Sequence, residues 1–123
     1  MTLHGEGRYD EALASFKAAL AARERTAKPA DIRVAHWMIA WTLRALKRHD
    51  DALVILRRLE RELAAIHATD GYVFEEIAEN LLAQGHAAAA KPYFARAHAA
   101  LSADTSLDRP DAEHLARLLS LSR

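Results

Sequence analysis

Apolar residues recur along this chain at the three-and-four spacing of amphipathic α-helices. The pattern predicts six helices, at about 9–25, 29–47, 51–68, 71–84, 87–102 and 110–120. Pro29 suits a first helical turn, and Asp50 can accept hydrogen bonds from the first amides of the helix that follows. Thr69-Asp70-Gly71 is a cap-and-turn cluster that opens the fourth helix. Pro92 lies inside the fifth helix and should bend it or leave its first turn irregular, because it removes one amide from the ladder.

The helical pattern repeats along the chain. When segment 33–63 is moved along the sequence until Ala52 falls on Ala90, seven of its positions match the next helix pair, and six of the seven pairs keep apolar character. The pairs under this 52-to-90 shift are His36–Phe74, Ile39–Ile77, Ala40–Ala78, Leu43–Leu81, Ala52–Ala90, Leu56–Phe94 and Leu59–Ala97. A 12-to-52 shift likewise carries Ala12, Leu13 and Phe16 onto Ala52, Leu53 and Leu56. The chain is therefore predicted to repeat a helix-turn-helix unit.

Three segments carry a recognisable signature. The first is Gly7-Arg8-Tyr9-Asp10-Glu11-Ala12-Leu13 followed by Phe16 and Ala19, and the second is Gln84-Gly85 followed by Ala90, Phe94 and Ala97. The middle copy, Arg48-His49-Asp50-Asp51-Ala52-Leu53 with Leu56, is weaker because Leu59 replaces a small residue. From Gly7 to about Leu101 the chain resembles the tetratricopeptide repeat family, which implies an all-α superhelix, a right-handed stack of antiparallel helix pairs.

The sequence departs from the family pattern in three ways. Its two periods, about 38 and about 40 residues, exceed the usual period of about 34. The proline that usually closes each repeat is absent, and the residues before Gly7 are too few for the opening helix of the first repeat. A generic antiparallel helical bundle is the alternative.

The repeats define the expected domain organisation. We expect one tetratricopeptide-like domain over residues 1–123. It comprises a truncated first repeat (1–28), a second repeat (29–69), a third repeat (70–103) and a C-terminal capping helix (108–121). The capping helix should bury Leu115, Leu118 and Leu119 and so close the open end of the stack.

The resemblance implies that the first helix of each repeat lines a concave surface. Beside the apolar stripe of the helix at 29–47 lies a row made of Val34, Trp37, Trp41 and Arg44. The 52-to-90 shift carries this row onto Tyr72, Glu75, Glu79 and Leu82. An aromatic ridge beside carboxylates suits a partner peptide or helix that carries apolar anchors and Lys or Arg. The alternative is that one or both tryptophans pack against the first helix.

A second candidate surface lies on the first helix. Without an opening helix, an apolar side made of Leu13, Phe16 and Leu20 should stay uncovered. Exposed apolar stripes tend to find partners. We therefore expect self-association, as a homodimer through the N-terminal helix, or docking onto a larger assembly. The alternative is that Met1 is not the natural start.

Composition narrows the function. Lys and Arg together number 17, as do Asp and Glu, and this neutral balance disfavours nucleic acid and anionic membranes as partners. With no cysteine and no histidine spacing suited to a metal, we expect no cofactor. The expected protein is a cytoplasmic interaction scaffold that is not an enzyme. The alternatives are a regulatory or chaperone-like subunit that holds one client and a small helical enzyme that uses Glu75 and Glu79.

Overall fold

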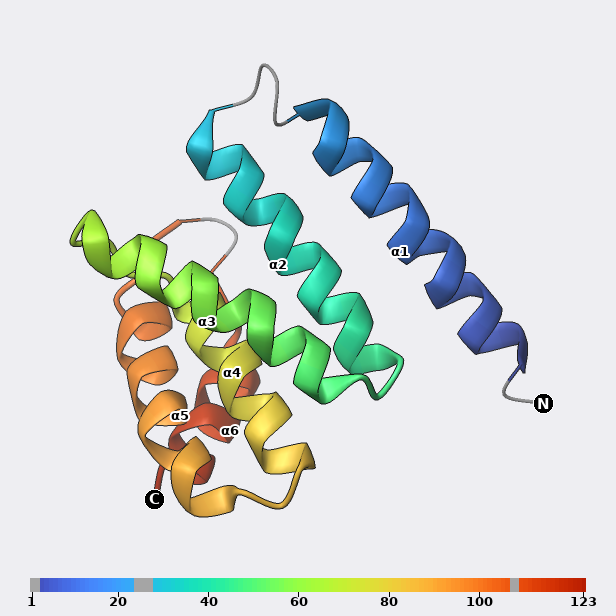
Figure 1. The fold of residues 1–123 in the computed structure, drawn as a ribbon. Coiled ribbons are helices and arrows are strands. Elements are labelled where there is room, and N and C mark those ends of the chain that lie inside the picture. The colour runs from blue at the N-terminus through green and yellow to red at the C-terminus, as the bar shows by residue number, and fades with distance from the viewer. Residues whose placement is uncertain (1–2, 24–27, 107–108) are drawn as a thin grey trace. The chain divides into compact units, whose positions relative to one another are not determined.

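Six α-helices make up the fold (Figure 1). The computed structural model describes residues 3–23, 28–106 and 109–123, and within these ranges it contains no strand. The helices are α1 (Leu3–Arg23), α2 (Pro29–Ala45), α3 (His49–Ala65), α4 (Gly71–Ala83), α5 (Ala87–Ser102) and α6 (Ala112–Leu121). The predicted all-α fold is confirmed.

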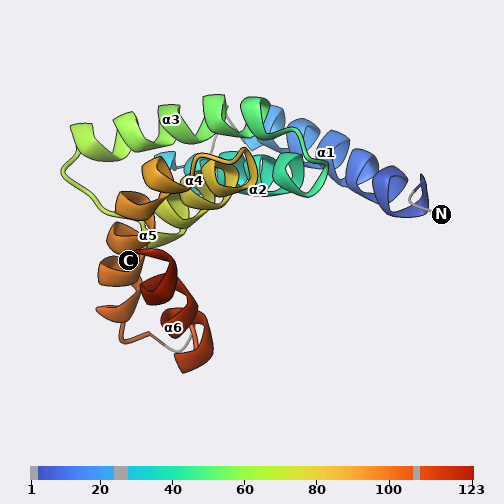
Figure 2. The same ribbon diagram turned by 90° about the horizontal axis from the view of Figure 1, so that it is seen from below.

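The helices form two compact units, Met1–Leu59 and Glu60–Arg123, and the boundary falls within α3. In the first unit, α1 packs against α2. In the second unit, α4 packs against α5, and α6 lies beside α5 (Figure 2). The sequence predicts one domain, and that expectation stays a prediction.

Most helix boundaries follow the sequence signals. Pro29 occupies the first turn of α2, and the side chain of Asp70 accepts a hydrogen bond from the amide of Tyr72 at 3.0 Å. The expected cap at Asp50 is wrong, because α3 begins at His49 and Asp50 therefore lies in its first turn. The expected start of the capping helix at 108 falls outside the described residues, and α6 is instead capped by Asp111, which accepts from the amide of His114 at 2.8 Å.

The repeat is visible in the burial of the side chains. Under the 52-to-90 shift, His36 and Phe74 are both half-buried, and the six apolar pairs are buried in both copies. The 52-to-90 shift also matches Thr42 with Asn80, and both of these polar side chains are fully buried. The Thr42 hydroxyl donates to the carbonyl oxygen of Met38 at 2.9 Å, and the Asn80 amide donates to that of Glu76 at 2.8 Å. Each bond spans four residues of one helix, so both copies satisfy a buried polar group in the same way.

The turn after the first helix of each pair is repeated as well. Lys47 and Gly85, which the 52-to-90 shift places at equivalent positions, both adopt positive φ angles, 62° and 83°. One residue later, the amides of Arg48 and His86 each donate to a carbonyl five residues back, that of Leu43 or Leu81, at 2.8 Å. This is the left-handed closing turn of a helix, in which glycine is favoured because it has no Cβ.

Candidate functional site

The predicted row on α2 lies wholly within the first unit. Val34 is 55% exposed and Trp41 40% exposed, while Trp37 and Arg44 are half-buried. The edge of the Trp41 ring system also meets Tyr9 of α1, with ring centroids 6.2 Å apart and an interplanar angle of 68°. This is the T-shaped geometry that aromatic pairs favour. Trp41 therefore packs in part against α1, which agrees with the alternative that a tryptophan packs against the first helix. It still presents apolar surface to solvent.

The row on α4 has a different environment, because α6 reaches two of its members. The Nε2 atom of His114 donates to Oε2 of Glu75 at 2.6 Å, and Nη2 of Arg117 donates to Oε1 of Glu79 at 2.9 Å. The side chains of Glu75 and Glu79 are each only 15% exposed. Both carboxylates thus already accept a hydrogen bond within the chain, and their use by a partner stays a prediction.

Sequence reasoning missed this pairing. His114 and Arg117 lie three residues apart on one helix, and Glu75 and Glu79 lie four apart on another, which is the spacing of residues that share a helical face. These spacings could have suggested that the predicted capping helix carries the complementary charges. The carboxylates had been assigned to an external partner instead.

Tyr72, the remaining member of the α4 row that the sequence assigned to a partner, is half-buried beside an open hollow of about 500 Å³. The hollow lies where α4 begins and α5 ends, and its lining includes Asp70, Tyr72, Leu101 and Asp104. A hollow lined by an aromatic residue and two Asp residues suits a side chain with an apolar stem and a positive end. The two predicted rows belong to different units, so the concave groove that would join them stays a prediction.

The predicted self-association surface on α1 needs correction. Leu13 and Leu20 are buried, because α1 packs against α2, and only Phe16 of the three is half-buried. The expected burial of α6 also differs from the structure. Leu118 is fully buried, but Leu115 is half-buried and Leu119 is 37% exposed.

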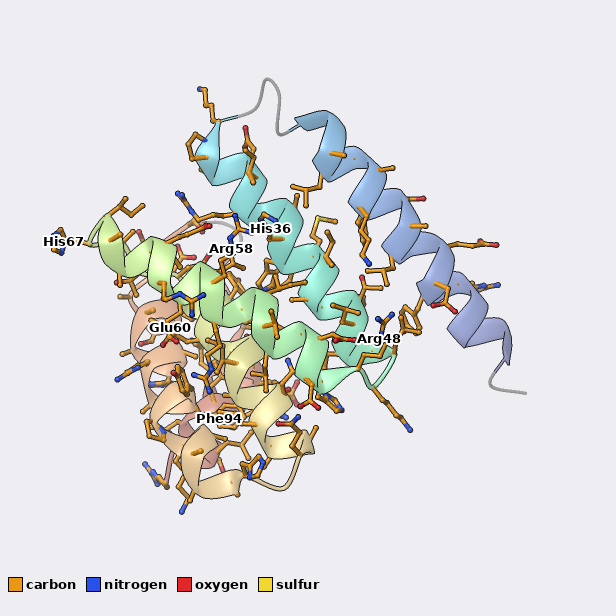
Figure 3. The ribbon with its side chains drawn as sticks, viewed as in Figure 1. His36, Arg48, Arg58, Glu60, His67 and Phe94 are labelled. Carbon is orange, nitrogen blue, oxygen red and sulfur yellow. The ribbon has the colours of Figure 1, made fainter. Side chains whose placement is uncertain are left out.

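Within the second unit, polar contacts tie α5 to Glu60 of α3, which is labelled in Figure 3. The hydroxyl of Tyr93 donates to Oε2 of Glu60 at 2.9 Å, and Arg96 lies 3.9 Å from the same oxygen. The Arg96 guanidinium also lies 5.3 Å from the centre of the Tyr93 ring. This cluster anchors one helix to the next, which is a structural role.

The described residues offer neither a metal site nor a membrane span. No group of three or more His, Asp or Glu side chains within these ranges could hold a metal ion. In the same part of the chain, no helix combines the length and the apolar character needed to cross a membrane.

The helix pair repeats its buried apolar positions, its left-handed closing turn and its buried side-chain hydrogen bond to the carbonyl four residues back. Such repetition defines a helical-repeat protein. Residues 1–61, about half of the chain, match the family model of the tetratricopeptide repeat. The chain belongs to the tetratricopeptide repeat family, as the sequence signature predicted. Neither the curated proteins nor the solved structures gave a match. Tetratricopeptide repeats are in general protein–protein interaction modules, and members of the family are typically not enzymes.

Proposed function

We propose that this protein is a cytoplasmic protein–protein interaction scaffold that binds a partner peptide or helix through the row on α2. The observation that carries the proposal is the pair Val34 and Trp41, two large apolar side chains that lie on one helix and are 55% and 40% exposed. Tryptophan is enriched among the residues that dominate binding energy, because its large rigid surface costs little entropy to order.

The partner that suits this protein carries apolar anchors together with Lys or Arg. Apolar side chains would cover Val34, Trp37 and Trp41. A positive side chain would find carboxylates at the hollow beside Tyr72, which Asp70 and Asp104 flank. We propose that these surfaces act together as a concave aromatic and acidic groove, in which Glu75 and Glu79 contribute to the acidic side. Because both carboxylates already pair with α6, we expect their contribution to be smaller than that of the aromatic row.

A comparison of three proteins tests the proposal. The wild type, a Trp37→Ala, Trp41→Ala double variant and a control Val54→Ala variant, whose side chain on α3 is 72% exposed, are each used to capture partners from the native source. Any captured protein is then purified and titrated against all three. We expect the double variant to bind at least about tenfold more weakly than the wild type, and the control to bind within about twofold. Equal affinities for all three would refute the assignment to α2.

We also propose that the protein self-associates through the side of α1 that carries Phe16. This side chain is half-buried even though α1 packs against α2. A symmetric homodimer through this helix is the simplest form of the proposal.

A further inference from the structure

The helix α6 has the chemistry of the partner proposed above, which carries apolar anchors together with Lys or Arg. On α6, Leu115, Leu118 and Leu119 recur at the three-and-four spacing that places side chains on one side of a helix. His114 and Arg117, which directly precede two of these leucines, add hydrogen-bond donors. This segment of the chain therefore combines aliphatic anchors with donors for carboxylates, as a ligand of an acidic surface would.

The same helix already occupies the carboxylates that we assign to the partner. His114 lies 2.6 Å from Glu75, and Arg117 lies 2.9 Å from Glu79, with all four residues in the second unit. Because the two glutamate side chains are each only 15% exposed, little of either carboxylate is open to a cation from another molecule. A partner that uses Glu75 and Glu79 must therefore compete with α6.

The attachment of α6 is weak enough to be reversed. Within this helix, all of which the structure describes, Leu118 alone is buried. The side chains of His114 and Arg117 are 33% and 49% exposed, so solvent screens their contacts with α4. A short segment held in this way can leave its place while the rest of the fold stays intact.

We propose that α6 is a built-in competitor of the partner, and that a partner helix of the same pattern docks on α4 and α5 when α6 is released. The partner segment, whose chemistry rests on the proposed function, then has aliphatic residues at positions i, i+3 and i+4 and basic residues at i−1 and i+2. Basic residues at both positions favour the partner over α6, because arginine keeps its charge at neutral pH, where histidine is largely neutral.

The tether gives α6 an advantage of its own. A segment of the same chain is present at an effective concentration in the mM range. Docked α6 therefore lowers the apparent affinity of every partner in proportion to the fraction of chains in which α6 is released. Whatever weakens the attachment of α6 should strengthen partner binding by the same factor.

The test uses the full chain, with a fluorescently labelled synthetic peptide of residues 110–123 as the probe. Leu118→Ala in the chain releases α6, and the peptide supplies the leucine that this chain lacks. Leu119→Ala is the matched control, because it removes the same atoms from an exposed position of the same helix. Fluorescence anisotropy gives the affinity of the peptide for each chain, and circular dichroism checks that the helices remain. We expect a dissociation constant on the order of 100 μM for Leu118→Ala, and binding at least about tenfold weaker to the wild type and to Leu119→Ala.

A second pair of variants leaves the buried core untouched. Arg117→Glu in the chain places a negative charge against Glu79, and Arg61→Glu makes the same change of charge at an exposed position of α3. The chain with Arg117→Glu should bind the peptide at least about threefold more tightly than the chain with Arg61→Glu.

Changes in the peptide locate the contact. Arg117→Glu in the peptide should weaken its binding to the Leu118→Ala chain at least about threefold, and Glu79→Arg added to that chain should restore the affinity. His114→Arg in the peptide should strengthen binding about twofold or more at pH 7.5, because it adds a permanent charge opposite Glu75.

Three results would overturn the proposal. A Leu118→Ala chain that keeps its helices but does not bind the peptide at about 1 mM overturns the docking site. Equal binding to the wild type and to both leucine variants overturns the competition by α6. A loss of affinity from the charged peptide that Glu79→Arg does not reverse overturns the role of Glu79. None of these results bears on the row on α2, and failure of the tryptophan variants to weaken the binding of a captured partner would leave the peptide results standing.

Discussion

The attachment of α6 depends chiefly on one side chain, and replacing Leu118 by alanine should release the helix. Leu118 is fully buried, whereas its neighbour Leu119 is 37% exposed. A Leu→Ala change at a buried site costs about 2–5 kcal/mol, through lost burial and the cavity left behind. The same change at Leu119 should cost less than about 1 kcal/mol, and since both residues are leucines within one helix, the helix propensity changes equally.

The other contacts of α6 cannot replace this loss. Its polar contacts with Glu75 and Glu79 come from His114 and Arg117, whose side chains are 33% and 49% exposed. Solvent screens such pairs, so each contributes about 0–1 kcal/mol. A helix of 10 residues is also too short to persist in water once it is detached. Losing about 2–5 kcal/mol should therefore open α6 locally while the α4–α5 pair remains folded.

Hydrogen exchange followed by mass spectrometry measures this local opening. Amides in the second half of α6 should exchange about 30-fold faster or more in Leu118→Ala than in the wild type. Leu119→Ala should change them by less than about fivefold, and amides of α4 and α5 should keep most of their protection in both variants. Equal exchange of α6 in the two variants would refute the reasoning. So would a loss of protection in α4 and α5 as large as that in α6.

Three further predictions concern single positions. Gly71→Ala should destabilise the fold by about 1–3 kcal/mol in urea unfolding, because the added Cβ would lie 2.6 Å from Cγ of the buried Leu101. Lys47→Gly should stabilise it by about 0.5–1 kcal/mol in the same assay, because Lys47 has a φ of 62° that glycine adopts without steric cost; a loss of stability would contradict this. Hydrogen bonds from Ser106, first from its backbone N–H and then from its hydroxyl, hold the pKa of Asp104 below its usual 3.8. The ionised carboxylate therefore stabilises the turn above pH 3.8, and this stabilisation is lost as the pH falls through the lowered pKa. An NMR titration should show the lowered pKa, and Ser106→Ala should move it only part of the way back, because the backbone donor remains.

Local signals in the sequence were sufficient to predict that the six helices exist and roughly where most of them begin and end. The fifth helix was predicted at 87–102 and is found as Ala87–Ser102, with Pro92 inside it. At the N-terminus they gave the wrong boundary, since α1 begins at Leu3 and runs through Gly5 and Gly7, whereas the sequence predicted a start at about residue 9. Glycine lowers helix propensity only by about 1 kcal/mol per residue, and packing of the adjacent apolar stripe can exceed that cost.

The candidate site was less predictable, because the partners and the burial of its side chains depend on contacts between segments far apart in the sequence. Periodicity placed Glu75 and Glu79 on one face of a helix, and the structure agrees, but periodicity does not reveal what lies opposite that face. The answer, His114 and Arg117, lies 39 and 38 residues further along the chain. Similarly, Leu115, Leu118 and Leu119 are alike in sequence, and only the packing of α6 against α5 separates the buried leucine from the exposed one.

The buried polar pair Thr42 and Asn80 has a consequence for how such a chain could lengthen. Each side chain donates to a carbonyl of its own helix, four residues earlier. Duplication of one whole repeat would carry donor and acceptor together into their new position. Insertion or deletion of whole copies would then preserve these two buried hydrogen bonds, which lowers one energetic cost of changing the length of the array.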